Sequence, residues 1–316
     1  MKKCIALILF AVISSMVLIS CSKTQTQGFP DRHIVYQAND VDEPMLGFIN
    51  ADGSLAELVT TDFYAIQPTW SADGKMLLFR QAPGDTGYTH SRPGYISIWK
   101  DDGTTTKCNW RKWQIGWIAS PLPDPKQTIL LDNYSRIVLV DIDKCKEVSV
   151  FVEVEDSDPG ELQKITSFSV SSSLNFILYT QESVNPRGFS MKLWNKESKE
   201  VDNIGQGINA ALSPNAKLAA YTWFDGIYII SLNDLSSTHL IDYDSRMSGS
   251  NSLFENVPPA PQWSPDGKWL IYHLCLVPKS KGMCAQIEDY SIYKLDIANG
   301  QEIKLVDGGI YPAWSD

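Results

Sequence analysis

The chain of 316 residues carries 37 acidic and 27 basic side chains, which gives a formal net charge of −10 at pH 7. A protein this acidic is not expected to bind nucleic acid or anionic lipid head groups, because both are negatively charged. Its six cysteines form no Cys-x-x-Cys pair and no cluster with histidine. This pattern argues against a zinc or haem site, so we expect no metal and no cofactor.

The first twenty residues (1–20) are predicted to be an export signal. Lys2 and Lys3 precede an almost unbroken apolar run over 5–19, which is too short for a comfortable transmembrane helix and typical of a signal-peptide core. The Leu-Ile-Ser-Cys sequence that ends at Cys21 resembles the bacterial lipobox. That resemblance implies cleavage before Cys21, a diacylglyceryl thioether on its sulfur and an acylated amino group. The alternative is an ordinary signal peptide with a chance cysteine.

Lipidation at Cys21 would anchor the protein stably, because several acyl chains together give stable membrane binding, whereas a single chain binds only reversibly. Ser22 stands where an aspartate is often associated with inner-membrane retention, so the periplasmic side of the outer membrane is the expected location in a host that has one. Residues 21–29 are short and polar and predict a lipidated flexible tether. Cleavage removes two lysines and no acid, so the formal charge falls from −10 to −12. The membrane contact would therefore be the lipid and not a basic patch.

The four cysteines beyond Cys21 predict disulfides, since an exported chain meets an oxidising compartment. Cys275 and Cys284 lie close in sequence and bracket a loop, so they are the first expected pair. A bond closing a loop of this length stabilises a fold by about 2–3 kcal/mol. Cys108 and Cys145 remain as the second expected pair.

A ten-residue motif recurs along the chain. Its clearest copies, at 70–79 and 263–272, share Trp-Ser-x-Asp-Gly-Lys followed by an apolar run that ends in an aromatic residue. Weaker copies and a truncated last one complete a series that starts at 70, 121, 170, 212, 263 and 314, with intervals of 51, 49, 42, 51 and 51 residues. Self-similarity with this period indicates stacked supersecondary modules.

Each repeat is predicted to hold four strands. The motif supplies an inner strand and an apolar strand, and a polar turn precedes a last short strand such as Glu302–Val306. Between them lie runs rich in Ile, Val, Tyr and Trp, namely Tyr95–Trp99, Ile137–Val140, Met191–Trp194, Ile227–Ile230 and Ser291–Leu295. With no sustained helical period, this pattern predicts an all-β fold, a six-bladed β-propeller with four-stranded antiparallel blades over 30–316. A β-sandwich or solenoid is the alternative, but a sandwich has no reason to repeat its turn chemistry.

The two ends of the chain are predicted to share one blade. The tail supplies a lone motif strand, Tyr311–Ser315, and the mature start supplies three strands, His33–Gln37, Leu46–Asn50 and Leu55–Val59. Pairing of the C-terminal strand with the N-terminal blade would close the ring. It would also remove a sheet edge that otherwise invites aggregation.

The motif residues themselves are interpreted as structural. Proline presets φ, aspartate bonds its own backbone and glycine tolerates positive φ, so Ser-Pro-Asp-Gly predicts a turn. A calcium set built from these aspartates is the alternative, but they would lie on different blades. Trp70, Trp263 and Trp314 are expected to pack between neighbouring blades, with a binding platform as the alternative role.

These motif residues resemble the TolB-type propeller repeat, most closely in the copies that start at 70, 263 and 314. The resemblance covers nearly all of 30–316. It implies six blades, and it implies a non-catalytic protein-binding scaffold, because propellers of that family commonly serve as protein-binding rings. Only a short tether precedes the blades, where TolB has an α/β domain, so the partners of TolB itself are not carried over.

Loop lengths predict which face of the propeller binds. One face would carry only short turns, and the other would carry the longer segments 81–94, 109–118, 154–164, 242–261 and 273–290. Long loops on a rigid scaffold are the usual place for recognition, and Trp, Tyr and Arg are favoured at interfaces. Insertions without a task are the alternative. The candidate binding residues on this face are Tyr88, His90, Arg92, Trp110, Arg111, Trp113, Asp156, Asp158 and Arg246.

Catalysis finds little support in the sequence. There is no Gly-x-Ser-x-Gly elbow, so a serine hydrolase is not expected. The alternative to a protein scaffold is a glycan or peptide binder, or a carbohydrate-active lyase or glycosidase, that uses the mouth of the central channel. A metal-assisted lyase would need clustered histidines, and only His90 and His273 fall on the predicted long loops. The expected partner is an envelope protein.

Overall fold

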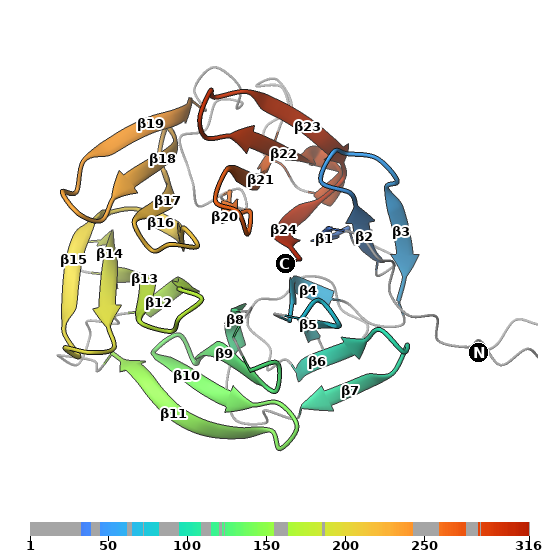
Figure 1. The fold of residues 1–316 in the computed structure, drawn as a ribbon, viewed down its shortest axis with the longest axis horizontal. Coiled ribbons are helices and arrows are strands. Elements are labelled where there is room, and N and C mark those ends of the chain that lie inside the picture. Colours follow the sequence, from blue (N-terminus) through green and yellow to red (C-terminus); the bar gives the residue numbers. More distant parts are fainter. Residues whose placement is uncertain are drawn as a thin grey trace, which may run out of the picture.

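The structure is a computed structural model that describes residues 33–38, 45–61, 65–71, 73–81, 95–108, 115–119, 122, 124–154, 164–184, 187–242, 259–275, 284 and 286–315. Its strands form six four-stranded sheets arranged in a ring (Figure 1). Strands within each sheet pair antiparallel. The chain is therefore a six-bladed β-propeller, as the repeat predicts.

The blades follow one another along the chain, and the strands of each blade run in order from the axis outward. Blade 1 is β24 (Ile310–Trp314), β1 (Ile34–Gln37), β2 (Met45–Ile49) and β3 (Glu57–Thr60). Blade 2 is β4 (Ala65–Trp70), β5 (Met76–Gln81), β6 (Tyr95–Lys100) and β7 (Thr105–Cys108). Blade 3 is β8 (Ile115–Ala119), β9 (Gln127–Asp132), β10 (Arg136–Asp141) and β11 (Lys146–Glu153).

The second half of the ring repeats this arrangement. Blade 4 is β12 (Lys164–Val170), β13 (Phe176–Val184), β14 (Arg187–Asn195) and β15 (Val201–Gln206). Blade 5 is β16 (Ile208–Leu212), β17 (Leu218–Trp223), β18 (Gly226–Ser231) and β19 (Ser237–Asp242). Blade 6 is β20 (Gln262–Trp263), β21 (Trp269–Cys275), β22 (Tyr290–Asp296) and β23 (Glu302–Asp307), with a short 3₁₀ helix η1 (Ile287–Asp289) before β22.

The hydrophobic core is divided among the contacts between blades. An apolar cluster lies at each of the six boundaries between neighbouring blades. The second and third strands of a blade are covered on both faces by its neighbours, so they are continuous apolar runs, whereas outer strands such as β3 are largely exposed. No blade can bury its apolar faces alone, and the ring is the unit of stability.

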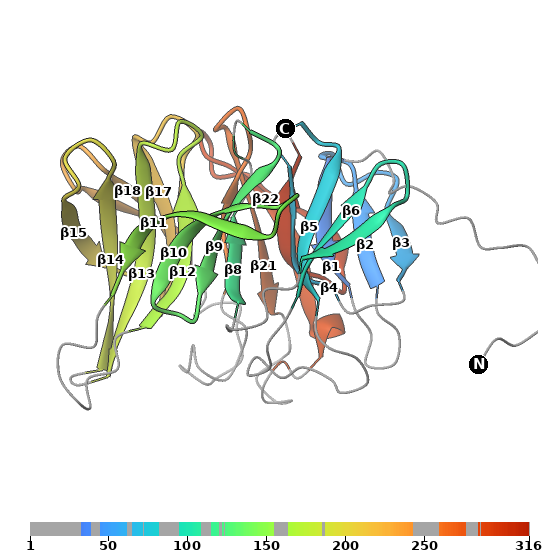
Figure 2. The ribbon, with the colours of Figure 1, turned by 90° about the horizontal axis from the view of Figure 1, so that it is seen from below.

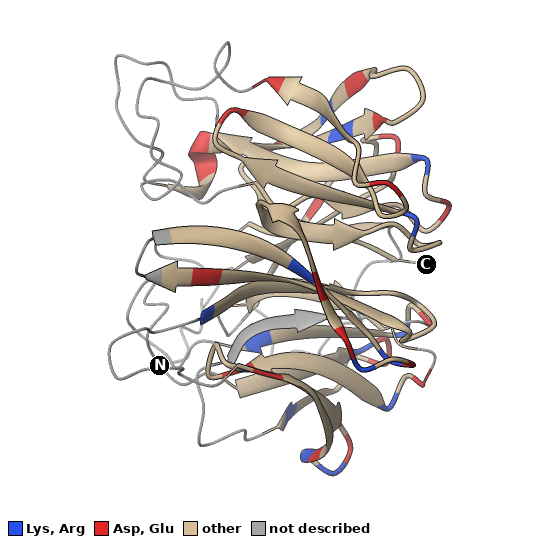
Figure 3. Ribbon diagram, turned by 90° about the vertical axis from the view of Figure 1, so that its left-hand side faces the viewer, with Lys and Arg blue, Asp and Glu red and all other residues tan. Residues whose placement is uncertain are grey.

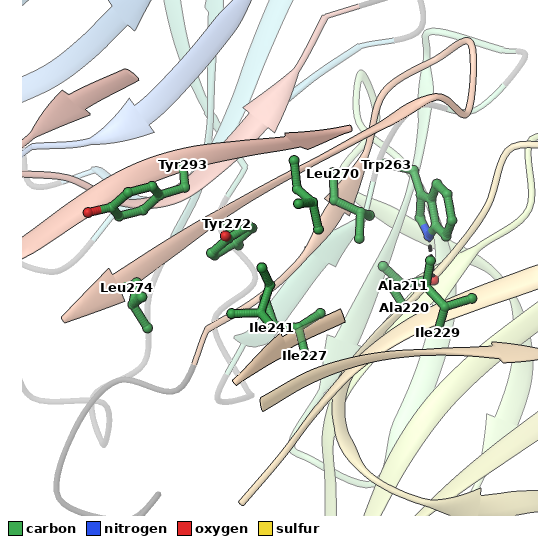
Figure 4. Packing of buried hydrophobic residues seen from close by; sticks show 11 residues of the cluster. Ala211, Ala220, Ile227, Ile229, Ile241, Trp263, Leu270, Tyr272, Leu274 and Tyr293 are labelled. Atoms are coloured by element: carbon green, nitrogen blue, oxygen red, sulfur yellow. Dashed lines mark hydrogen bonds between the residues drawn. The ribbon is translucent and has the colours of Figure 1, made fainter. Parts of the chain in front are cut away.

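Two motif tryptophans pack between blades, as predicted. Trp263 joins the cluster between blades 5 and 6, and its indole N–H donates a hydrogen bond of 3.0 Å to the Ala211 carbonyl of the preceding blade (Figure 4). Trp70 lies in the cluster between blades 1 and 2, edge-on to Phe48 at 6.3 Å between ring centroids. Trp314 is half-buried and packs against the cluster between blades 6 and 1.

The ends of the chain close the ring in blade 1. Ile34 pairs with Trp314 and Val35 with Ala313. The Ser315 N–H extends this ladder by donating to the His33 carbonyl at 2.8 Å. The prediction that the last strand completes the first blade is confirmed. The first and last described residues, His33 and Ser315, lie at the place where the other blades have their motif turn.

The motif serine has a role that the turn interpretation did not assign. In blade 6 the Ser264 hydroxyl donates to Asp266 Oδ1 at 2.6 Å and accepts the Trp269 N–H at 3.0 Å. Asp266 Oδ1 also accepts the Lys268 N–H at 3.1 Å. These bonds make the aspartate a turn residue, as predicted. Blade 2 repeats the same set with Ser71, Asp73 and Lys75.

The two faces of the propeller differ. The motif turns and the turns before the outer strands lie together on one face, which we call the short-turn face (Figure 2). Among the described residues, lysine, arginine, aspartate and glutamate are frequent at these turns (Figure 3). Strands such as β5 and β21 end on the opposite face, which we call the long-segment face (Figure 2).

Several bounds of the predicted long segments are corrected by the strands. Residues 115–119 form β8, the inner strand of blade 3, so 109–118 is not one loop. His273 belongs to β21 and is fully buried, so it does not stand on a loop. Within the part of the chain that the structure describes, no helix is long and apolar enough to cross a bilayer.

The closing strand gives a test of the ring as the unit of stability. Ile310 of β24 is 1% exposed, and Ile310→Ala is expected to lower the free energy of unfolding by about 2–4 kcal/mol, the usual cost of such a cavity. Ile303→Ala, at a residue 38% exposed on β23, is the matched control and should cost less than about 1 kcal/mol. Urea denaturation measures both, and equal losses would contradict the inference.

Candidate functional site

A channel of about 270 Å³ lies at the axis of the propeller. Every blade contributes to its wall, from β24, β4, β12, β16 and β20 and from Leu122 in blade 3. Ser172, Pro214 and Pro265 belong to motif turns, are exposed or half-buried and also line it. The channel mouth therefore opens on the short-turn face, opposite the long-segment face.

The described residues of the channel wall carry no charge. Among the described lining residues there is no Asp, Glu, Lys, Arg or His. The wall combines aromatic rings, proline rings, amides and hydroxyls, with Phe168, Trp263, Trp314, Pro68, Pro312, Gln67, Gln262, Thr69 and Ser213 among them. Such a surface can pack on apolar groups and exchange hydrogen bonds, but these residues offer no general acid or base.

The inner strands are irregular where they line the channel. The pairing of β4 with β5 shifts register between Ile66 and Thr69, which marks a β-bulge, and β24, β8, β12 and β16 show the same kind of shift. Gln67 and Tyr311 have left-handed backbones, with φ of 54° and 49°, and a proline follows each. Strained backbone of this kind persists only where the surrounding structure holds it in place, and it is often found at functional sites.

Buried polar side chains on the second strands hold these irregular segments. Gln37 Oε1 accepts the Gln67 N–H at 3.3 Å, and His273 Nδ1 accepts the Tyr311 N–H at 3.3 Å. The Thr222 hydroxyl donates to the Pro259 carbonyl at 2.8 Å. A bulge removes ladder partners from the backbone, and a buried unpaired backbone group is costly. Gln37 and His273 therefore replace lost ladder bonds, whereas Thr222 holds the segment that precedes β20.

The three supporting residues, Gln37, Thr222 and His273, occupy one position of the repeat, directly after the last residue of the motif. The same position holds a buried polar residue in two further blades, Arg80 and Thr180, and Leu131 in blade 3. His273 also contacts the rings of Tyr290 and Tyr311, at 5.8 and 5.1 Å between centroids. The sequence signal for this layer was a polar residue inside an otherwise apolar strand.

Burial raises the pKa of Tyr311 to about 12, although the nearby Arg80 charge and a hydrogen bond from Gln67 act to lower it. The phenol therefore stays protonated at any ordinary pH. Tyr311 lines the channel, so the wall remains neutral there.

The binding residues predicted from loop length fall elsewhere. Tyr88, His90, Arg92, Trp110, Arg111, Trp113, Asp156, Asp158 and Arg246 all lie outside the described residues, and so does Cys21. The second loop histidine, His273, is part of the buried layer behind the channel. In the described portion of the chain, no three metal-ligating side chains gather in one place.

Both expected cysteine pairs are brought together by the fold. Cys108, at the end of β7, lies with its Cα atom 5.4 Å from that of Cys145, in the turn after β10, so this pair links blades 2 and 3. Cys275 and Cys284 are 6.2 Å apart between Cα atoms and share an apolar cluster with Tyr290 and Ile310. Both separations suit a disulfide.

Comparison with known proteins gives a likeness in fold. No family model matches the chain, and no curated protein matches it. Among solved structures, TolB from Acinetobacter baumannii superposes with a TM-score of 0.62 and 13% identity, over 90% of this chain and 66% of that one. The fold is similar to that of TolB. A putative TolB from Agrobacterium tumefaciens agrees, with a TM-score of 0.60 and 13% identity over 88% of this chain and 89% of that one.

An enzyme shares the architecture as well. An oligogalacturonate lyase in complex with manganese superposes with a TM-score of 0.51 and 15% identity, over 85% of this chain and 74% of that one. At such identities a likeness establishes the fold and leaves the function open. The chain spans just under two thirds of the length of the Acinetobacter TolB, so the activity of that whole protein is not transferred.

The cysteine pair beside β24 can be tested directly. Exchanging both Cys275 and Cys284 for serine should lower the free energy of unfolding by about 2–3 kcal/mol if they form a disulfide, because the bond restricts the unfolded chain. The same variant should show no further loss on adding a reductant that leaves Cys108 and Cys145 oxidised. Denaturation with and without reductant measures this, and peptide mapping under non-reducing conditions identifies the bonds. A variant as stable as the wild type would contradict the pairing.

Proposed function

We propose that this chain is a non-catalytic lipoprotein of the bacterial cell envelope whose propeller is a protein-binding scaffold. The observation that carries the proposal is the neutral axial channel. A catalytic site at the axis would need acids, bases or metal ligands there, yet the described lining residues hold no titratable side chain other than Tyr311. That wall suits packing and hydrogen bonding with another molecule.

The charge of the chain argues against the kind of substrate for which the similar lyase is named. Oligogalacturonate is a polyanion, whereas this chain has a formal net charge of −10. A polyanion would be repelled by the acidic surface and would meet no lysine or arginine among the described lining residues. The lyase alternative is therefore weaker than a protein scaffold, and so is a glycosidase, which needs two carboxylates at the site.

We place the main protein contact on the long-segment face, as loop length and residue type predict. The combined change of His90, Arg92 and Trp113 to alanine should abolish recovery of a partner crosslinked to the protein in intact envelopes. The matched control changes Lys199, Lys217 and Asp234 to alanine, three residues of the short-turn face that do not line the channel. Unchanged recovery with the first variant would remove this face from the proposal.

The membrane anchor has its own test. Cys21→Ser removes the thiol that would carry the diacylglyceryl group, so the protein should move from the membrane fraction to the soluble periplasmic fraction. Metabolic labelling with a radioactive fatty acid should mark the wild type and not the variant. Cys4→Ser, within the export signal, is the matched control and should leave labelling unchanged. Equal labelling of wild type and Cys21→Ser would contradict lipidation.

A further inference from the structure

Two contacts between neighbouring blades share one arrangement. In each, a buried side chain on the second strand of one blade accepts the N–H of a bulged residue on the inner strand of the next blade. Gln37 Oε1 accepts the Gln67 N–H between blades 1 and 2, and His273 Nδ1 accepts the Tyr311 N–H between blades 6 and 1, both at 3.3 Å. Both donor residues have left-handed backbones and precede a proline. We call these contacts the Gln37 joint and the His273 joint.

The two acceptors differ in their response to acid. An amide oxygen does not titrate in the range that proteins meet, whereas an imidazole nitrogen accepts a hydrogen bond only while it carries no proton. Because Nδ1 accepts the Tyr311 N–H, the His273 side chain is neutral in the folded protein. Proton uptake at Nδ1 would set two N–H groups against each other. Acid therefore breaks the His273 joint and leaves the Gln37 joint intact.

The surroundings of His273 also disfavour a charged imidazole. Its side chain is 0% exposed, so a positive charge there would lose its hydration. The described titratable and charged groups around the joint are Tyr290, Tyr311, Tyr134, Arg80 and Asp289. The tyrosines are uncharged between pH 5 and 8, and the Arg80 guanidinium adds positive charge. The Asp289 carboxylate accepts the Gln286 N–H at 3.1 Å, in η1 before β22.

The His273 joint lies at the closure of the ring. Tyr311 belongs to β24, the strand that completes blade 1, and His273 belongs to β21 of blade 6. The hydrogen bond between them therefore fastens the closing strand to the last blade. Tyr311 also lines the channel, so a change at this joint reaches the channel wall.

We propose that His273 is an acid-sensitive latch on the closing strand, so that proton uptake by its imidazole removes the acceptor of the Tyr311 N–H and loosens β24. An unperturbed histidine takes up a proton near pH 6.5. The closed state binds this proton less readily than a state in which His273 is released. The latch is therefore fully held above about pH 6.5, and the released state gains up to about tenfold in population for each pH unit below it.

Amide hydrogen exchange of the folded protein at pH 7.5 and pH 5.5 tests the latch. The readout is the protection factor, which corrects for the intrinsic effect of pH on exchange. The protection of the Tyr311 amide should fall about tenfold at the lower pH, one unit below the histidine midpoint. The Gln67 amide is the internal control, because its acceptor does not titrate, and its protection should stay unchanged. Equal changes at the two amides, or no change at Tyr311, would overturn the proposal.

A substitution that copies the Gln37 joint completes the test. His273→Gln supplies an amide oxygen that acid does not remove, so the protection of the Tyr311 amide should no longer fall between pH 7.5 and pH 5.5. His239→Gln, at an exposed histidine on β19, is the matched control and should keep the wild-type response. A Tyr311 amide that remains acid-sensitive in His273→Gln would overturn the role of His273.

A measurement on the wild type covers the case in which His273→Gln does not fold. The imidazole nitrogen resonances of His273 report whether Nδ1 carries a proton. In the folded protein Nδ1 should remain unprotonated at pH 5.5, because the closed joint uses its lone pair. A His273 side chain that titrates near pH 6.5 within the folded protein would overturn the proposal.

Discussion

The structure depends on the pairing of β24 with β1. Blades bury their apolar faces only against one another, so an open ring would leave the clusters at two faces uncovered. The ladder from Ile34 and Val35 to Trp314 and Ala313 prevents this, because it makes the first and the last segments of the chain parts of one sheet. The packing between all six blades therefore depends on backbone pairing between residues nearly 280 positions apart.

Closing a ring around an axis also creates the channel. The inner strands must therefore both pair within their blades and form the channel wall. Their bulges turn backbone groups out of the regular ladder, and the second strands supply buried Gln37 and His273 as replacement partners. Support and wall are therefore one system. A substitution of Gln37 or His273, which do not line the channel, would therefore shift Gln67 or Tyr311, which do.

Much of the fold could be predicted from sequence, because repetition and turn chemistry are local signals. The period near fifty residues, the Ser-Asp-Gly turns and the lone last strand predict six blades and their closure. Blade 3 was placed least well, since its motif copy at Pro121 lacks the aromatic anchor and hides the strand Ile115–Ala119. The sequence predicts that a six-bladed ring has a central channel, but it does not identify the residues that shape the channel wall. Its decisive residues, Gln67 and Tyr311, precede the motif, and their left-handed backbones arise from tertiary support that no local pattern encodes.

The place where the chain enters the propeller limits how the molecule can stand on a membrane. His33 is held beside Ser315, which follows the channel-lining Trp314 at the short-turn end of β24. Eleven residues lie between it and Cys21, and a fully extended chain of this length spans at most about 40 Å. With a lipid on Cys21, the axial opening would be confined to the layer next to the bilayer, while the opposite side could be presented to the interior of the periplasm. One molecule could then bridge a membrane-bound neighbour and a more distant one.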